Sequence, residues 1–337
     1  MAYLYLSLAA EHCLACYRID PGTGDLELFD QVAVPGEPSV QGTDPKRRFL
    51  YAAMRSTGQI VSFAIDAASG RLQHLHTLDT GLEDPAYLRT DHTGRFLLTP
   101  YYASGKVTLY PIGADGTARA PVASVVDTAP HAHGIALSTD NRHVFVPHTC
   151  PGNGIWQLLL EEGQLRLNAV SKVGFDHDRG PRHAHFHPNG RLLYSVDEQG
   201  NSVTTYQYDA DTGTLTPGQS LSTVPPDHQG GACARMELHP SGRFLYAANR
   251  GHDSIAVFII DPDTGALTAN GQVPTAANPR SFDMDPSGRF LYAAGESADR
   301  LIAYRIDPED GALQAIKTYT TGRIPWWVHI VEPGRAA

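Results

Sequence analysis

Hydrophobic residues in this chain occur in runs of four to seven positions that are separated by Gly, Pro and Asp. The runs are rich in Val, Ile, Leu, Tyr and Phe, and no useful window shows the 3.6-residue period of an amphipathic helix. One unit shows an alternating run at 244–248, a polar loop, a second run at 254–260 and a turn at 261–267. Runs bounded in this way are typical of antiparallel β-strands, so the sequence predicts an all-β protein.

The runs recur as a repeat that is marked by a Pro-x-Gly-Arg turn. The sequence His-Pro-Ser-Gly-Arg-Phe-Leu-Tyr-Ala-Ala at 239–248 is nearly copied as Asp-Pro-Ser-Gly-Arg-Phe-Leu-Tyr-Ala-Ala at 285–294. The turn arginine recurs at intervals of 47, 47, 49, 52 and 46 residues, at Arg48, Arg95, Arg142, Arg191, Arg243 and Arg289. Four strands in each unit of about 40 to 50 residues are typical of a β-propeller blade.

The two ends of the chain carry the two parts of one further blade. Residues 2–7 resemble the second strand of the repeat at 49–53, whereas residues 321–331 repeat the pattern around the first strand at 275–284. We therefore expect a seven-bladed β-propeller with four antiparallel strands per blade. A C-terminal inner strand would join the N-terminal blade and close the ring without a free edge. We expect residues 1–337 to form this single domain, with about 48 residues per blade.

Charge and composition narrow the range of partners. The formal net charge of −10 argues against nucleic-acid binding, but a local group of arginines could still attract a small anion. No apolar stretch is long enough to span a membrane and no basic segment precedes the N-terminal stretch, so we expect a cytoplasmic protein. We expect no cofactor, and the pattern does not indicate an oligomeric state. The four cysteines are too few and too scattered for a disulfide scaffold.

Two positions of the repeat vary and often carry ionisable side chains, whereas the structural positions keep Phe, Leu, Tyr, Ala or Gly. The first position lies nine residues before the turn arginine, and its occupants are Ser39, Ala86, His133, Arg182, Ala234 and Arg280. The second lies seven residues after it, and its occupants are Arg55, Tyr102, Thr149, Glu198, Arg250 and Glu296. Both positions fall on loops at the same face of a propeller, where ligand sites commonly lie.

The residue types at these positions suggest binding and hydrolysis of an anionic substrate. Arg182 and Arg280 could hold one carboxylate or phosphate from two sides, although each could instead pair with a neighbouring acid such as Glu198 or Glu296. Either His133 or Glu198 could accept a proton from water. Further side chains expected to contact the substrate are Arg250, His183, Arg55, Tyr102, Glu296 and Trp326. The turn arginines lie on the opposite face and are expected to be structural.

Two other patterns are expected to be structural. His183, His185 and His187 alternate along one strand, so two of them could reach one metal ion. No Asp or Glu joins them at ligand spacing, and we expect no metal site. Cys13 and Cys16 have CxxC spacing but enter a strand, so we expect ordinary strand residues.

Four motifs resemble those of a known family. They are Gly-Pro-Arg-His at 180–183, Asn-Pro-Arg-Ser-Phe at 278–282, Ser-Thr-Asp-Asn-Arg at 138–142 and Pro-Trp-Trp-Val at 325–328. With these motifs the whole chain resembles the bacterial 6-phosphogluconolactonase family of the seven-bladed propeller type, which is related to the fungal carboxy-muconate lactonising enzymes. The resemblance implies an active site of one His, two Arg and one Glu, which match His133, Arg182, Arg280 and Glu198. It also implies a lactonase that opens a sugar lactone, with 6-phosphogluconolactone as the first substrate to test.

Three other functions remain open at this point. The chain could be a cyclase or isomerase for muconate-like diacids, a metal-dependent sugar lactonase, or a non-catalytic propeller that binds other molecules. No Ser or Cys lies in a nucleophile elbow, which argues against covalent catalysis. The stretches 148–153 and 225–231 depart from the family pattern, and we expect the second, which lengthens the approach to Ala234, to reshape the pocket.

Overall fold

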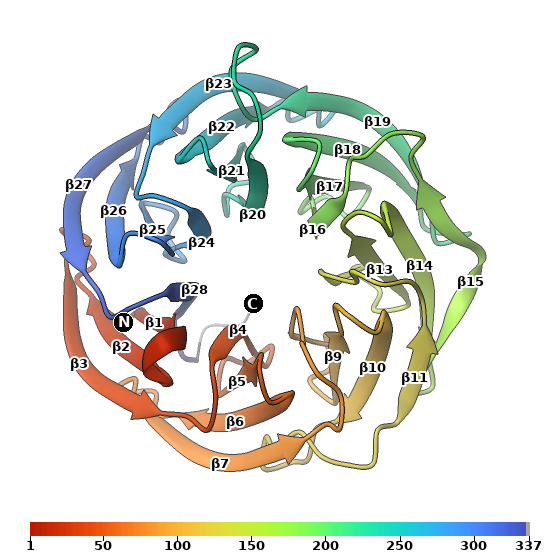
Figure 1. Ribbon diagram of the computed structural model, residues 1–337, viewed down its shortest axis with the longest axis horizontal. Helices are drawn as coiled ribbons and strands as arrows, with labels where there is room; N and C mark the ends of the chain where they lie inside the picture. The colour runs from red at the N-terminus through yellow and green to blue at the C-terminus, as the bar shows by residue number, and fades with distance from the viewer. Residues whose placement is uncertain (335–337) are drawn as a thin grey trace.

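The computed structural model describes residues 1–334, which form a ring of seven four-stranded antiparallel sheets around a central channel (Figure 1). In each sheet the strands follow one another in chain order from the channel to the perimeter, with the one exception described below. This arrangement confirms the predicted seven-bladed β-propeller. The one described helix is the short 3-10 helix η1 (Ala9–Glu11). No helix in this part of the chain is long and apolar enough to cross a membrane.

The strands fall into four concentric sets. The innermost strands are β4 (Pro38–Thr43), β8 (Arg89–Thr90), β12 (Ala136–Leu137), β16 (Pro181–Phe186), β20 (Ala232–Leu238), β24 (Pro279–Met284) and β28 (Pro325–Val331). The second strands are β1 (Tyr3–Leu8), β5 (Phe49–Met54), β9 (Phe96–Pro100), β13 (His143–His148), β17 (Leu192–Asp197), β21 (Phe244–Arg250) and β25 (Phe290–Gly295). The third strands are β2 (Cys13–Ile19), β6 (Gln59–Ile65), β10 (Lys106–Pro111), β14 (Gly154–Glu161), β18 (Ser202–Asp209), β22 (Ser254–Ile260) and β26 (Arg300–Ile306). The outer strands are β3 (Leu26–Ala33), β7 (Leu72–Asp79), β11 (Ser124–Asp127), β15 (Gln164–Gly174), β19 (Thr214–Ser222), β23 (Leu267–Pro274) and β27 (Leu313–Thr320).

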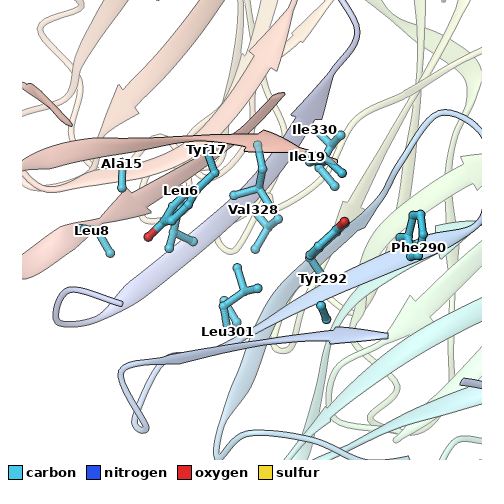
Figure 2. Close-up of a cluster of buried hydrophobic side chains, with 13 residues drawn as sticks. Leu6, Leu8, Ala15, Tyr17, Ile19, Phe290, Tyr292, Leu301, Val328 and Ile330 are labelled. Atoms are coloured by element: carbon cyan, nitrogen blue, oxygen red, sulfur yellow. The ribbon is translucent and has the colours of Figure 1, made fainter. Parts of the chain in front are cut away.

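The exception is the blade that joins the two ends of the chain. Its strand order is β28-β1-β2-β3, and β28 pairs antiparallel with β1 so that Leu6 lies opposite Val328. Val328 and Ile330 pack with Leu6 on one side and with Tyr292 of the preceding blade on the other (Figure 2). The joint therefore has the hydrogen bonds of a sheet and an apolar core, as the sequence predicts.

A β-bulge in five innermost strands directs side chains into the mouth of the channel. In β16, Pro181 lies opposite Asp197 and His183 lies opposite Val196, so Arg182 is an extra residue without a partner. The register shifts by one residue in the same way near the start of β4, β20, β24 and β28. A bulge places an unpaired residue next to a paired one and re-aims its side chain. Arg182, Arg280 and Trp326 owe their positions to this feature.

Neighbouring blades are joined by a side chain that covers a glycine. The residue that follows the turn, or its counterpart in β1, packs so closely on a glycine of the next blade's outer hairpin that a Cβ there would meet it. The pairs are Tyr3–Gly70, Phe49–Gly116, Phe96–Gly163, His143–Gly213, Leu192–Gly265, Phe244–Gly311 and Phe290–Gly24. In five blades a buried tyrosine hydroxyl also donates to the carbonyl oxygen of that glycine, at 2.8 to 3.0 Å.

The turn arginines lie beside these hairpins, on the face opposite the bulges. Arg243 donates through Nη1 to the carbonyl oxygen of Pro308 at 3.1 Å, and Arg289 donates through Nη2 to that of Pro21 at 2.5 Å. These contacts fit the structural role expected from the sequence.

We predict that Gly311→Ala destabilises the ring more than Gly271→Ala. Both glycines have positive φ, +75° and +88°, so alanine costs about 1–2 kcal/mol of backbone strain at each. A Cβ at Gly311 would also lie 2.6 Å from the Phe244 ring, whereas Gly271 has nothing within 4 Å. Overpacking adds about 1–3 kcal/mol, and urea unfolding measures the difference. Equal losses of unfolding free energy would show that the glycine contact does not hold the blades together.

Candidate active site

A narrow cavity opens at the end of the channel where the innermost strands begin, and we call it the mouth cavity. Its lining includes five residues expected from the sequence, which are Arg55, His133, Arg182, Arg280 and Trp326. The space left between these side chains is about 10 Å³, which is close to the volume that one water needs. The ring therefore brings together side chains that lie more than 270 positions apart in the chain.

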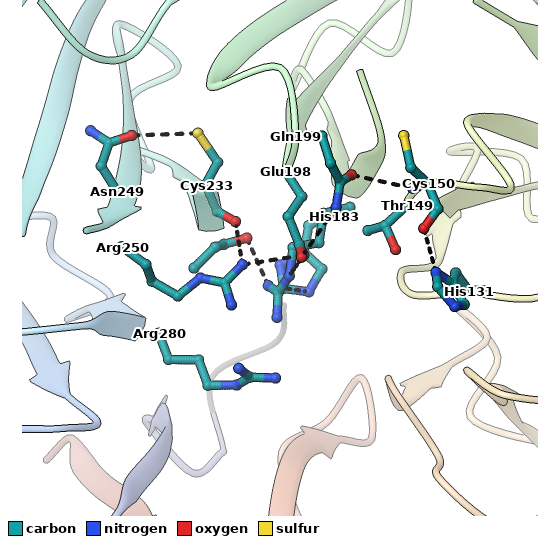
Figure 3. Close-up of polar contacts among 12 residues, drawn as sticks. His131, Thr149, Cys150, His183, Glu198, Gln199, Cys233, Asn249, Arg250 and Arg280 are labelled. Atoms are coloured by element: carbon teal, nitrogen blue, oxygen red, sulfur yellow. Dashed lines mark hydrogen bonds and ion pairs between the residues drawn. The ribbon is translucent and has the colours of Figure 1, made fainter. Parts of the chain in front are cut away.

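Arg182 and Arg250 share one carboxylate at this mouth (Figure 3). Arg182 Nε lies 2.8 Å and Arg250 Nη2 lies 3.3 Å from the same oxygen, Oε2 of Glu198. Each guanidinium also donates to a backbone carbonyl oxygen, Arg182 to Ala234 at 2.7 Å and Arg250 to Cys233 at 2.9 Å. The sequence left open whether Arg182 binds substrate or pairs with an acid such as Glu198, and this ion pair does form.

The Glu198 carboxylate keeps a deeply buried cation in place. Arg182 is only 2% exposed, and burial lowers its pKa well below the usual value, which Glu198 partly opposes. A buried guanidinium needs a partner because desolvation disfavours its charge. Glu198 thus fixes Arg182 as a cation facing the cavity.

Arg280 and Arg55 both lie close to the indole ring of Trp326. The guanidinium carbon of Arg280 lies 3.9 Å from the ring centroid, and that of Arg55 lies 5.3 Å from it. Arg55 Nε forms an ion pair with Asp84 Oδ1 at 2.8 Å, whereas Arg280 Nη1 lies 3.6 Å from Glu296 Oε2. Burial lowers the pKa of Arg280 to about 10, so it remains cationic near neutral pH. Its long ion pair leaves donors of Arg280 available to an anion that enters the mouth.

His133 is an uncharged imidazole among these cations. It is 6% exposed, and burial, then Arg182, Arg280 and Arg55, lower its pKa well below the usual value. Its Nδ1 is buried and has no hydrogen-bond partner within residues 1–334. A neutral imidazole nitrogen can accept a proton, so His133 has the state that a general base requires.

His183 lies below the mouth cavity and does not line it. It is 1% exposed, and its ring centroid lies 5.1 Å from that of His133. Its Nε2 lies 3.3 Å from Arg182 Nη1, and its ring also packs against Tyr87 and Trp327. His183 therefore packs beneath the side chains that line the cavity. It could affect the substrate only through those side chains, and its predicted direct contact with substrate stays a prediction.

The other two alternating histidines have separate surroundings. His185 Nε2 lies 3.8 Å from Glu237 Oε2 on the channel wall, and His187 Nε2 lies 3.2 Å from the carbonyl oxygen of Gly242 at the turn. In the described part of the chain, no three His, Cys, Asp or Glu side chains are grouped so that they could hold a metal ion.

The stretch 148–153 builds the wall beside His133. Tyr102 contacts His133 edge to face, with ring centroids 5.7 Å apart, and its hydroxyl lies 3.3 Å from Thr149 Oγ1. His131 stacks on Tyr102 at 4.3 Å and contacts the carbonyl oxygen of Cys150 (Figure 3). This stretch therefore contributes to the surroundings of His133. Residues 225–231, like residues 148–153, lie outside the lining of the mouth cavity, and the expected effect of 225–231 on the pocket stays a prediction.

The mouth carries a small excess of positive charge. Four guanidinium groups, those of Arg55, Arg182, Arg250 and Arg280, face three carboxylates, those of Asp84, Glu198 and Glu296. Such a site favours an anionic ligand and can stabilise negative charge that develops on an oxygen.

Sequence reasoning missed two residues of this site. Trp327 lines the mouth cavity and contacts the rings of Tyr87 and His183. No sequence signal marked Trp327, because the β-bulge at Trp326, which allows both residues to face the channel, is seen only in the structure. Asp84 belongs to the loop that connects the blade of Arg55 to the next blade, and no repeat position marks it as the partner of Arg55.

Comparisons with known proteins agree on one family. The family model described as "Lactonase, 7-bladed beta-propeller" matches residues 6–330. The chain is 33% identical to a 6-phosphogluconolactonase of Pectobacterium carotovorum over 309 residues, which cover 91% of this chain and 92% of the relative. It is 34% identical to a 6-phosphogluconolactonase of Yersinia pestis, with 97% of each chain covered. The solved structure of a periplasmic gluconolactonase of Pseudomonas aeruginosa is similar with a TM-score of 0.91 and 26% identity, and the match covers 98% of this chain and 99% of that one.

We predict that Glu198→Gln destabilises the protein by about 2 kcal/mol, because it leaves Arg182 and Arg250 without their shared counter-charge. Glu296→Gln is the matched control, since its ion pair with Arg280 is longer and should contribute less than about 1 kcal/mol. Denaturant unfolding of the two variants measures both losses. A Glu198→Gln variant as stable as the control would contradict the role given to this carboxylate.

Proposed function

The chain belongs to the seven-bladed β-propeller lactonase family, and we propose that it hydrolyses 6-phosphogluconolactone at the mouth cavity. The family and the names of its relatives support the opening of a sugar lactone by water. The assignment of individual residues rests on the geometry and charge of the mouth.

The observation that carries the proposal is a neutral imidazole beside two guanidinium groups in one cavity. His133, Arg182 and Arg280 all line the mouth cavity, and the two arginines are among the causes that keep His133 uncharged. Ester hydrolysis by water needs a proton acceptor for the attacking water and positive charge where the carbonyl oxygen becomes an oxyanion. These three side chains supply both.

In the first step His133 accepts a proton from a water molecule as the water oxygen attacks the lactone carbonyl carbon. The electron pair of the carbonyl bond moves to the carbonyl oxygen, which becomes an oxyanion. We assign Arg182 to this oxygen because it is the more deeply buried arginine and is held by Glu198 and Ala234. A donor that is fixed before the reaction needs no reorganisation when the charge develops.

In the second step the oxyanion reforms the carbonyl bond and the bond between the carbonyl carbon and the ring oxygen breaks. The imidazolium of His133 returns its proton to the leaving ring oxygen, which becomes a hydroxyl group. The product is the open sugar acid, whose carboxylic proton passes to the solvent. His133 is neutral again and ready for another turnover.

We assign Arg280, together with Arg55 or Arg250, to binding the phosphate group of the substrate. Arg280 packs against Trp326 and retains donors that face the mouth, and Arg55 also lies close to the Trp326 ring. Planar guanidinium groups bind phosphate oxygens in pairs, so Arg280 with Arg55 or Arg250 suits a phosphorylated substrate.

His133 suits the role of general base better than Glu198. Protonation of Glu198 would leave two guanidinium groups without their shared counter-charge. Glu198 is therefore assigned to positioning Arg182 and Arg250. The cytoplasmic location expected from the sequence stays a prediction.

We predict that His133→Asn lowers kcat for 6-phosphogluconolactone by about 10²- to 10⁴-fold, because general-base catalysis contributes that much, while KM changes little. His76→Asn is the control, because His76 is exposed on β7 at the perimeter. The rate is measured above the spontaneous opening of the lactone. A His133→Asn variant with wild-type kcat would rule out this base.

The pH profile tests the same assignment independently. Because the pKa of His133 is lowered well below 6.5, its neutral form persists as the pH falls. The acidic limb of kcat/KM should therefore lie well below pH 6.5, with a flat profile above it. A loss of half the activity at pH 6.5 or higher that disappears in His133→Asn would contradict a buried, uncharged base.

A further inference from the structure

A second cavity, which we call the far cavity, lies at the other end of the channel, near the turns of the repeat. It has a volume of about 200 Å³, and the residues that matter here are Gln41, Gly42, Arg89, Arg235, Trp327 and His329. Trp327 lines both cavities, so its indole ring separates the far cavity from the mouth. The far cavity takes no part in the proposed lactonase chemistry.

One further position of the repeat builds this end of the channel. It lies six residues before the turn arginine, or at its counterpart in β28, and its ionisable occupants are Arg89, His185, Glu237, Asp283 and His329. Gly42 occupies the same position in its blade, lines the far cavity and lets the backbone of Leu88 approach closely, since a Cβ at Gly42 would lie 2.9 Å from the Leu88 carbonyl oxygen. The repeat therefore directs charged side chains to the far end of the channel as well as to the mouth.

Most charges at this end of the channel are already paired. Arg235 Nε lies 2.6 Å from Glu237 Oε1, and its Nη2 lies 3.7 Å from Asp283 Oδ2. The guanidinium of Arg235 also packs over Trp327 at 4.1 Å and donates to the carbonyl oxygen of Val328 at 2.6 Å. The charge and the hydrogen-bond donors of Arg235 are therefore already engaged by groups of the protein.

Arg89 differs from Arg235 in having no partner. Its side chain is half-buried and lines the far cavity, and it makes no hydrogen bond or ion pair with any residue that the structure describes. A half-buried guanidinium without a counter-charge is costly unless an anion compensates it. The guanidinium of Arg89 is therefore the charged group that is available to bind a ligand in the far cavity.

Three further polar atoms at the far cavity are unused. Gln41 Oε1, Trp327 Nε1 and His329 Nε2 are buried and have no hydrogen-bond partner among residues 1–334. Some other polar side chains of the lining are engaged: Asp44 accepts hydrogen bonds within its turn, and Thr90 Oγ1 donates to the carbonyl oxygen of Thr43 at 2.9 Å. Native proteins leave few buried polar atoms unsatisfied, and such a group beside a cavity suggests a missing ligand.

The electrostatic environment favours an anion over a cation. Burial lowers the pKa of both His185 and His329 to about 3, with Arg89 or Arg235 adding to the shift, so both rings are neutral near pH 7. Glu237 and Asp283 face Arg235. Burial raises the pKa of Asp283 to about 7, so this carboxyl carries only part of a negative charge near neutral pH. Arg235 therefore balances most of the negative charge of Glu237 and Asp283, and part of the positive charge of Arg89 remains uncompensated.

We propose that the far cavity binds a small anion with a phosphate or carboxylate group, which accepts hydrogen bonds from the guanidinium of Arg89 and from Trp327 Nε1. Gln41 Oε1 and His329 Nε2 are placed to contact hydroxyl groups of the same molecule. Both inorganic phosphate and a phosphorylated sugar acid have this chemistry, and the experiment distinguishes them.

The test is calorimetric titration of the full chain with inorganic phosphate and with 6-phosphogluconate, in buffer free of other oxyanions. Arg280→Gln weakens binding at the mouth, so the binding that remains reports the far cavity. In that background Arg89→Gln should weaken binding by about tenfold or more, since a charge-assisted pair is lost. Arg89→Lys should restore part of the affinity. Arg95→Gln is the matched control, because it removes an exposed arginine from the turn of the same blade.

The outcomes separate the two ligands and the two sites. Weaker binding of both compounds in Arg89→Gln identifies the phosphate group as the feature recognised, whereas an effect on 6-phosphogluconate alone identifies the sugar acid. Equal affinity and stoichiometry for both ligands in the Arg89→Gln and Arg95→Gln variants would overturn the proposal. Arg89→Gln should keep wild-type lactonase kcat in phosphate-free buffer, so this result is independent of the proposed catalysis.

Discussion

The ring depends on the contact between one blade and the glycine of the next blade's outer hairpin. In each blade a side chain, usually aromatic, packs directly on that glycine. In five blades a tyrosine hydroxyl also donates a hydrogen bond to the carbonyl oxygen of the glycine. Any residue larger than glycine would separate the blades. Because the contact repeats all the way round, and the strand pair β28–β1 joins the ends, the innermost strands are held at fixed positions around the channel.

Fixed innermost strands make it possible to bury charge in the channel. Arg182 is nearly inaccessible, and Arg280 and His133 are mostly buried, which would be unfavourable in a flexible scaffold. The β-bulges turn these side chains toward one point, and carboxylates from neighbouring strand ends compensate the guanidinium groups. The neutral state of His133 follows from this arrangement, because burial and nearby cations both disfavour its protonated form. The same contacts that stabilise the fold thus determine the chemistry of the mouth.

Much of this arrangement could be predicted from the sequence because it repeats. The repeat of the turn arginine, together with the chain length, predicted seven blades. The two chain ends resemble different strands of one blade, which predicted the closing strand. Both predictions are confirmed. Counting from the same arginine identified the positions of His133, Arg182 and Arg280, which line one cavity. A repeat fixes where a backbone position lies, and that was sufficient to find the mouth.

The rest depends on contacts between different blades, which a repeat does not encode. The sequence did not show that Glu198 is shared by two arginines, that His183 lies beneath the site, or that Asp84 holds Arg55. The position that carries Arg89 and His329 is also occupied by Gly42 and Ala136, so its ionisable character was easy to overlook. Recognising it required knowing that the bulge shifts the channel-facing register by one residue.

The central claim is that the mouth of this propeller hydrolyses a phosphorylated sugar lactone. The most direct test is the rate at which the purified wild-type protein opens 6-phosphogluconolactone and unphosphorylated gluconolactone, each corrected for spontaneous opening in the same buffer. The account predicts a rate proportional to protein concentration, with a higher kcat/KM for the phosphorylated lactone because guanidinium groups surround the mouth. Rates equal to the buffer blank for both lactones, at every protein concentration, would contradict it.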